Sequence, residues 1–156
     1  MRTVLAFAAM LALTFFFGLL IICAALVGIT PKPNGFLEGL PRRWTRLVLG
    51  AAGSRVRLHS SAILDSPSTH VYVSNHVSWF DVFALASILP RFRFVAKKEL
   101  SRLPIFGKAA GAVAAIYIDR NNRKAAFEGY RAAAEEIRGG VNVAVYPEGT
   151  RGHSYA

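Results

Sequence analysis

An uncharged run at the amino terminus constrains this chain more than any other feature. No charged residue occurs from Thr3 to Pro31, and Val4 to Ile29 is almost wholly apolar. A helix of about 20 apolar residues crosses a hydrocarbon core of about 30 Å, because it rises about 1.5 Å per residue. The run is therefore long enough for a membrane helix, and the remaining residues must form a domain beside it.

A cleaved signal peptide is the main alternative, because Met1-Arg2 is a minimal basic start. The run is longer than the apolar core of most signal peptides, and no polar segment with a clear cleavage site follows it. We therefore expect residues 1–30 to be an uncleaved membrane anchor. Four basic residues follow closely: Lys32, Arg42, Arg43 and Arg46. The positive-inside rule then predicts that the rest of the chain lies on the cytoplasmic side of the inner or plasma membrane.

The amino-acid composition indicates which classes of partner the chain can bind. The 156 residues suffice for one domain, and their formal charge of +10 comes from 19 Lys and Arg against 9 Asp and Glu. This charge suits an anionic partner, and the scatter of the basic residues favours lipid or phosphate over nucleic acid. Cys23 is the only cysteine, which excludes an intrachain disulfide and a cysteine-based metal site.

Residues 31–54 are expected to form an amphipathic linker helix. Apolar residues recur at helical spacing from Phe36 to Leu49, with arginines among them. The helix either lies on the bilayer surface, with Trp44 at headgroup level, or packs on the domain. Pro41 indicates a kink, or a helix that begins there.

Residues 55–156 have the pattern of an α/β domain. Strands are expected at 55–58, 71–74, 92–96, 113–118 and 141–146, and helices at 81–89 and 124–138. Strands that alternate with helices predict a mainly parallel central sheet flanked by helices, with the site at the carboxyl ends of the strands.

The stretch from Val71 to Asp81 joins a strand to a helix. Ser78 has the position of an N-cap and Asp81 that of the third helical residue, so His76 precedes the helix. Within one continuous helix His76 and Asp81 would lie about 140° apart, whereas the break lets the imidazole fold back towards the carboxylate. Such a pair acts as a general base on a substrate hydroxyl. The simpler interpretation is that Asp81 only caps the helix and His76 is an ordinary loop residue.

Two further motifs follow strand ends: Asp119-Arg120 and Glu148-Gly149-Thr150-Arg151. Arg120 and Arg151 have the donor geometry for phosphate, Gly149 allows close approach of the backbone, and Glu148 can position an arginine or bond the acceptor. Lys97 and Lys98 add positive charge after another strand. Taken singly, Asp119-Arg120 is also typical of a surface pair and Pro147 to Thr150 of an ordinary turn. The remaining residues of interest are assigned no role in catalysis or cofactor binding: His59, His70, His153, Trp79 and Phe80.

Together these motifs resemble the 1-acylglycerol-3-phosphate (lysophospholipid) acyltransferases. The resemblance covers residues 55–151 and rests on NHVSWFD (75–81), FVAKKEL (94–100), PIFG (104–107), IYIDR (116–120) and YPEGTR (146–151). It implies transfer of a fatty acyl group from acyl-CoA or acyl carrier protein to the hydroxyl of lysophosphatidic acid, giving phosphatidic acid. By the same resemblance His76 is the general base, Asp81 orients it, and Arg120 with Glu148, Gly149, Thr150 and Arg151 binds the phosphate.

The chemistry of the residues agrees with this resemblance. A thioester donor is already activated, so no metal or other cofactor is expected, and the sequence has no Gly-x-Ser-x-Gly motif for an acyl-serine intermediate. The alternatives are transfer to another lysolipid such as a lyso-aminolipid, a non-catalytic membrane-binding remnant, and a hydrolase that uses water.

One departure concerns length. The chain ends five residues after Arg151, whereas the family continues. Two explanations are open, a fragment of a longer enzyme and a short form of doubtful activity. In either case Val141 to Tyr146 is expected to become an exposed apolar edge.

Overall fold

The computed structural model describes residues 2–32, 35–61, 64 and 68–149, with the side chain of Arg2 excepted. Its elements in chain order are α1 (Arg2–Leu26), α2 (Phe36–Ala52), β1 (Val71–Val73), α3 (Trp79–Ile88), β2 (Phe92–Lys97), the 3-10 helix η1 (Lys98–Arg102), α4 (Phe106–Val113), β3 (Ala115–Ile118), α5 (Arg123–Arg138) and β4 (Asn142–Val145).

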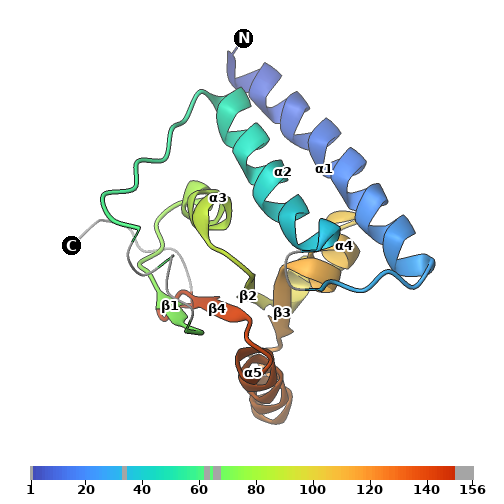
Figure 1. Ribbon diagram of the computed structural model, residues 1–156, viewed down its shortest axis with the longest axis vertical. Helices are drawn as coiled ribbons and strands as arrows, with labels where there is room; N and C mark the ends of the chain where they lie inside the picture. Colours follow the sequence, from blue (N-terminus) through green and yellow to red (C-terminus); the bar gives the residue numbers. More distant parts are fainter. Residues whose placement is uncertain (1, 33–34, 62–63, 65–67, 150–156) are drawn as a thin grey trace.

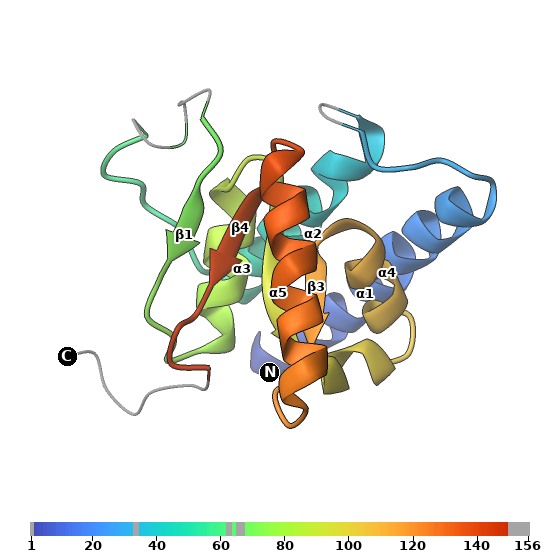
Figure 2. The ribbon, with the colours of Figure 1, turned by 90° about the horizontal axis from the view of Figure 1, so that it is seen from below.

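The four strands form one parallel sheet in the order β1-β4-β2-β3. Figure 2 shows α5 across one face of this sheet and the other helices beyond it. Because all the strands are parallel, their carboxyl ends meet at one edge, where the segments with the sequence motifs begin. The α/β class predicted from the sequence is confirmed.

The amino-terminal helices pack on the domain. α1 and α2 run side by side (Figure 1) and enclose a core with α4, made of Ile21, Ala24, Leu37, Leu40, Ala109 and Val113. Thr3–Leu26 is the one helix among the described residues that is long and apolar enough to cross a membrane, and only 17% of its most apolar window is buried. One side of α1 therefore belongs to the protein core, and the rest is apolar surface.

Of the two alternatives for α2, the structure shows the packed helix. Its Trp44 ring lies edge-on against Phe83, with centroids 5.5 Å apart, and 6.0 Å from Phe106. The helix begins at Phe36, so Pro41 lies inside it and is buried. The helix start at Pro41 was wrong, because burial of the residues around it outweighs the local signal. The placement of Trp44 at a bilayer surface stays a prediction.

Two arginines of α2 bind the end of α3. The Arg42 guanidinium Nη2 donates to the Leu89 carbonyl at 2.9 Å, and Arg46 Nε donates to the Ser87 carbonyl at 2.9 Å. The last carbonyls of a helix have no partner within it and carry partial negative charge. These arginines therefore join α2 to the domain.

Three local expectations need correction. Residues 55–58 are exposed and form no strand. The edge strand β1 pairs only with β4 among the described strands, so residues 55–58 do not join the sheet beside it. Val113 ends a helix, α4, that the pattern did not predict, and the strand begins at Ala115. The segment 141–146 is not an exposed edge: β4 lies between β1 and β2, with Val143 and Ala144 almost fully buried.

Candidate active site

The predicted meeting of His76 and Asp81 is confirmed. Ser78 caps α3 by accepting a hydrogen bond from the Phe80 N–H, and Asp81 occupies the third helical position. His76 Nδ1 lies 3.3 Å from Asp81 Oδ2. A carboxylate only accepts, so Nδ1 carries the proton and Nε2 keeps its lone pair. The imidazole is thus oriented to accept a proton at Nε2.

Asp81 is held as a carboxylate by its surroundings. Burial alone would raise its pKa, but the N–H groups of Ser78 (2.7 Å) and Val77 (2.8 Å) donate to Oδ2, and His76 adds a third contact. Together these contacts keep the pKa of Asp81 below its ordinary value. The negative charge beside the imidazole therefore persists at neutral pH.

An aromatic ring covers the face of the imidazole. Tyr146 follows β4, and its ring stacks on His76 with centroids 4.2 Å apart and planes 25° apart. The sequence analysis did not assign Tyr146 a role. Its position directly before Pro147 and Glu148, in the motif YPEGTR (146–151), placed it near the predicted site but gave no sign of the contact with His76.

The basic residues come from the neighbouring strand ends. Lys97 ends β2, Arg120 follows β3, and Gly149 follows β4. The Arg120 guanidinium donates to the Gly149 carbonyl. Gly149 has φ +69°, a backbone conformation that favours glycine, and a Cβ there would lie 2.8 Å from the movable end of the Arg120 side chain.

The other predicted residues are less closely involved. Glu148 is exposed, and Thr150, Arg151 and His153 lie outside the described residues. Lys98 pairs with Asp119 at 3.1 Å, and this hydrogen bond lowers the pKa of Asp119. Lys97 Nζ lies 3.5 Å from Glu99, but more than half of its side chain is exposed, which leaves the ammonium group open to a ligand.

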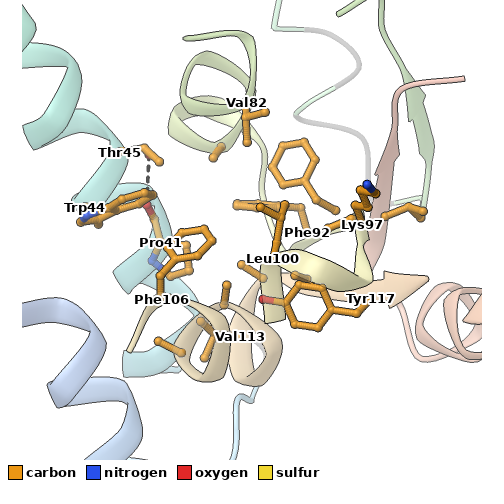
Figure 3. Close-up of a pocket in the computed structure, with 18 of the residues that line it drawn as sticks. Pro41, Trp44, Thr45, Val82, Phe92, Lys97, Leu100, Phe106, Val113 and Tyr117 are labelled. Carbon is orange, nitrogen blue, oxygen red and sulfur yellow. Dashed lines mark hydrogen bonds between the residues drawn. The ribbon is translucent and has the colours of Figure 1, made fainter. Parts of the chain in front are cut away.

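An apolar cavity of about 300 Å³ reaches His76. Its lining includes Lys97, Arg120 and Gly149, while its walls come from five helices and two strands. Figure 3 shows Trp44 on one side and Lys97 on the other, with Phe106 and Val113 below. Residues Phe17, Gly18 and Ile21 of α1 also contribute. The cavity thus has apolar walls and a few polar groups, as small-molecule sites usually do.

Four side chains to which the sequence assigned no role are two histidines and two aromatic residues: His59, His70, Trp79 and Phe80. His59 is exposed, and His70 packs against Tyr72 with ring centroids 5.8 Å apart. Phe80 packs edge-on against Phe83, whereas Trp79 is 45% exposed and lines the cavity. No group of three metal-binding side chains occurs in the part of the chain that the structure describes.

Residues 55–156 match the family described as Acyltransferase. The chain belongs to this family.

Relatives of this acyltransferase differ in the acceptor that their names give. It is 33% identical over 111 residues to the lyso-ornithine lipid O-acyltransferase of Rhizobium meliloti, an overlap of 71% of this chain and 37% of that protein. It is 34% identical over 84 residues to a 1-acyl-sn-glycerol-3-phosphate acyltransferase of Neisseria gonorrhoeae, covering 54% of this chain and 32% of that protein. The chain therefore spans about a third of the length of these relatives.

The fold also has a solved counterpart. The acyltransferase superposes on the crystal structure of the 1-acyl-sn-glycerophosphate (LPA) acyltransferase PlsC from Thermotoga maritima with a TM-score of 0.69 and 20% sequence identity. The match covers 97% of this chain and 64% of that one, so it includes the amino-terminal helices. At this identity the likeness concerns the fold.

Sequence reasoning found the polar residues of the site and missed the apolar ones. His76, Lys97, Arg120 and Gly149 line one cavity, with Asp81 behind His76. The cavity walls from α1, α2 and α4 were not foreseen, because apolar residues in a helix have the same pattern whether they face lipid, core or cavity. The roles of the named residues stay predictions.

Proposed function

We propose that this chain forms the active site of an enzyme that transfers a fatty acyl group from a thioester to the free hydroxyl of lysophosphatidic acid. The observation that carries the proposal is the position of the His76–Asp81 pair at an apolar cavity whose lining includes Lys97 and Arg120. Such a cavity suits an acyl chain, and the cations suit a phosphate beside the reacting hydroxyl.

The reaction needs one base. His76 Nε2 takes the proton of the acceptor hydroxyl while its oxygen attacks the thioester carbonyl, and Asp81 stabilises the imidazolium that forms. The tetrahedral intermediate then expels the thiolate, which recovers the proton from His76. The products are the acylated lipid, here phosphatidic acid, and the free thiol, with the imidazole returned to its starting state.

The donor is acyl-CoA or acyl carrier protein, and transfer is direct. Ser74 and Ser78 are the serines nearest to His76 in sequence. The Ser74 hydroxyl donates to the Asn75 carbonyl, and the Ser78 hydroxyl accepts the Phe80 N–H as a helix cap. A thioester requires no metal ion or further cofactor for attack by an alcohol.

For the acceptor, Lys97, Arg120 and the segment Glu148, Gly149, Thr150 and Arg151 form the phosphate site. Arg120 and Gly149 are in contact, so the loop after β4 and the loop after β3 act together. Parallel guanidinium donors recognise phosphate in a bidentate manner.

A second acceptor is a lyso-aminolipid without phosphate. The observation that favours it is the Rhizobium meliloti relative, named for lyso-ornithine lipid, which overlaps 71% of this chain. Competition with glycerol phosphate analogues separates the two: these analogues inhibit acylation if the acceptor site binds phosphate, and have no effect on a phosphate-free acceptor site.

The protein works at a membrane, with α1 as the anchor and the α/β domain on the cytoplasmic side. The lysolipid acceptor then reaches the cavity from lipid: α1 lines the cavity with Phe17 and Gly18 and exposes Phe15 and Phe16 on its other side.

The first test removes the base. In the 156-residue chain His76→Ala lowers acceptor-dependent transfer from labelled acyl-CoA by about 10²–10⁴-fold. His59→Ala, a change at an exposed histidine away from the cavity, is the control and retains activity. Unchanged turnover in His76→Ala refutes the assignment. A chain without acceptor-dependent transfer is the non-catalytic remnant, and fatty acid release without acceptor identifies a hydrolase.

The second test addresses the phosphate. Arg120→Ala raises the KM for lysophosphatidic acid by about 10–100-fold, the effect of losing a charge-assisted hydrogen bond, with a smaller change in kcat. Arg131→Ala, which removes an exposed arginine of α5, leaves KM unaltered. Equal KM values for Arg120→Ala and the unaltered chain exclude Arg120 from the acceptor site. Arg151→Ala is expected to behave like Arg120→Ala.

A further inference from the structure

The imidazole of His76 is held from two directions. Asp81 contacts its edge at Nδ1, 3.3 Å away, and Tyr146 lies on its face with ring centroids 4.2 Å apart. Only 16% of the His76 side chain is exposed. The two contacts restrict both rotation of the ring within its plane and tilting out of it.

Tyr146 is itself well fixed. Phe94 of β2 lies parallel to it, with centroids 6.0 Å apart and planes 5° apart. The Tyr146 carbonyl accepts a hydrogen bond from the Gly149 N–H at 3.0 Å, at the turn that leads to the predicted phosphate site. His76, Tyr146 and Phe94 thus form a stack that runs from the carboxyl ends of β1 and β4 to the middle of β2.

The phenol oxygen of Tyr146 is buried and has no hydrogen-bond partner among the described residues. Burial, with a contribution from the Asp81 carboxylate, raises the pKa of this phenol, so it stays neutral. Because the hydroxyl makes no hydrogen bond there, the contact with His76 is one of ring against ring.

We propose that Tyr146 is a positioning residue of the transfer reaction, which orients the His76 ring and stabilises its protonated form. The proposal rests on the proposed function and adds a residue to it. When His76 accepts the proton of the acceptor hydroxyl, its ring becomes a cation, and an aromatic face within about 6 Å attracts a cation. The neutral ring before transfer gains less from this contact, so the contact favours the transition state over the ground state.

Substitutions at position 146 separate the ring from the hydroxyl. Tyr146→Leu removes the aromatic face and is expected to lower kcat about tenfold, the size of a partly desolvated cation–ring contact, with little change in KM. Tyr146→Phe keeps the face and rescues most of this loss. Tyr130→Leu makes the same change at an exposed tyrosine of α5 and serves as control.

A spectroscopic measurement tests the stack without turnover. The carbon-bound ring protons of His76, assigned by comparison with His76→Ala, are expected to show an upfield ring-current shift in the unaltered chain and in Tyr146→Phe. In Tyr146→Leu this shift disappears. If the chain transfers no acyl group, the proposed function fails, whereas an absent ring-current shift overturns the stack itself.

Two kinetic results also overturn the proposal: an unchanged kcat in Tyr146→Leu, and an equal loss in Tyr146→Phe, which would assign the effect to the hydroxyl. If the leucine variant does not fold, a ring-fluorinated phenylalanine at position 146 keeps the size of the ring and weakens its negative face. A lower kcat than Tyr146→Phe then supports the proposal, and an equal kcat refutes it.

Discussion

A single oxygen of Asp81 serves both the fold and the site. Oδ2 accepts hydrogen bonds from the Val77 and Ser78 N–H groups and contacts His76 Nδ1. The carboxylate thus completes the capping box of α3 and, at the same atom, orients the imidazole. A change at this residue affects stability and activity together.

This double role predicts a pH-dependent stability. The pKa of Asp81 is lower in the folded chain than its ordinary value, so the ionised group stabilises the fold. The stabilisation is complete above the unfolded pKa of about 4 and is lost as the pH falls through the lower folded pKa. Asp81→Asn is expected to lower the free energy of unfolding by about 1–3 kcal/mol at pH 7.

Thermal unfolding in detergent at several pH values measures this effect. The difference in Tm between Asp81→Asn and the unaltered chain should shrink as the pH falls below about 4. Glu128→Gln, at an exposed site on α5, controls for the loss of a charge. A difference in Tm that stays constant with pH would show that the charge of Asp81 contributes nothing to stability.

At the residue scale, His76 and Asp81 were predictable because their meeting depends on local rules. A cap residue, a carboxylate at the third helical position and a strand before them determine the geometry within a few residues. Tyr146 was not predictable, because its stacking on His76 depends on β4 being placed beside β1, which no local pattern encodes.

At the scale of elements, α2 is attached to the domain by polar contacts as well as by its apolar face. Arg42 and Arg46 bind the last carbonyls of α3, whereas Arg43 between them is exposed. This arrangement ties the wall of the cavity that contains Trp44 to the helix that carries Asp81.

The contrast between Arg42 and Arg43 is testable. Arg42→Ala should lower the free energy of unfolding by about 1–3 kcal/mol, because it leaves the Leu89 carbonyl without this donor, while Arg43→Ala should change it by less than about 0.5 kcal/mol. Denaturant unfolding in detergent compares the two. Equal effects would mean that the hydrogen bond to Leu89 adds nothing to stability.

Two local predictions failed for the same reason: contacts with distant segments decide whether a weak helix or strand forms. α4 contains two glycines and is short, so its local helix signal is weak, yet the apolar contacts of Ala109 and Val113 with α1 and α2 stabilise it. Gly107 is needed where α4 begins, because a Cβ would collide with the Ser101 carbonyl. Residues 55–58 had a strand pattern but find no partner strand among the described ones.

For the whole molecule, α1 carries a large exposed apolar surface. Ile21 and Ala24 on its inner side are buried, while Phe7, Leu11 and Phe15 are each more than half exposed and recur every four residues. An exposed apolar stripe of this length is typical of a surface that contacts lipid or another protein, which is why we propose the membrane contact there.

Charges on that stripe should release the protein. Leu11→Asp combined with Phe15→Asp is expected to move the chain from the lipid to the soluble fraction in liposome flotation, because each buried carboxylate costs about 3 kcal/mol at the membrane centre. Phe127→Asp alters an equally exposed apolar residue on α5 and should float with the liposomes. Flotation of the double variant would place the membrane contact elsewhere.

The sequence alone determined the features that depend on neighbours along the chain: the apolar amino-terminal helix, the α/β class, and the polar residues at strand ends. The tertiary structure decided which surfaces meet: α1 and α2 forming walls of the cavity, β4 inside the sheet, and Tyr146 on the His76 ring. The physical reason is that hydrogen bonding and periodicity act over a few residues, whereas apolar packing is non-directional and chooses partners only when distant segments are assembled.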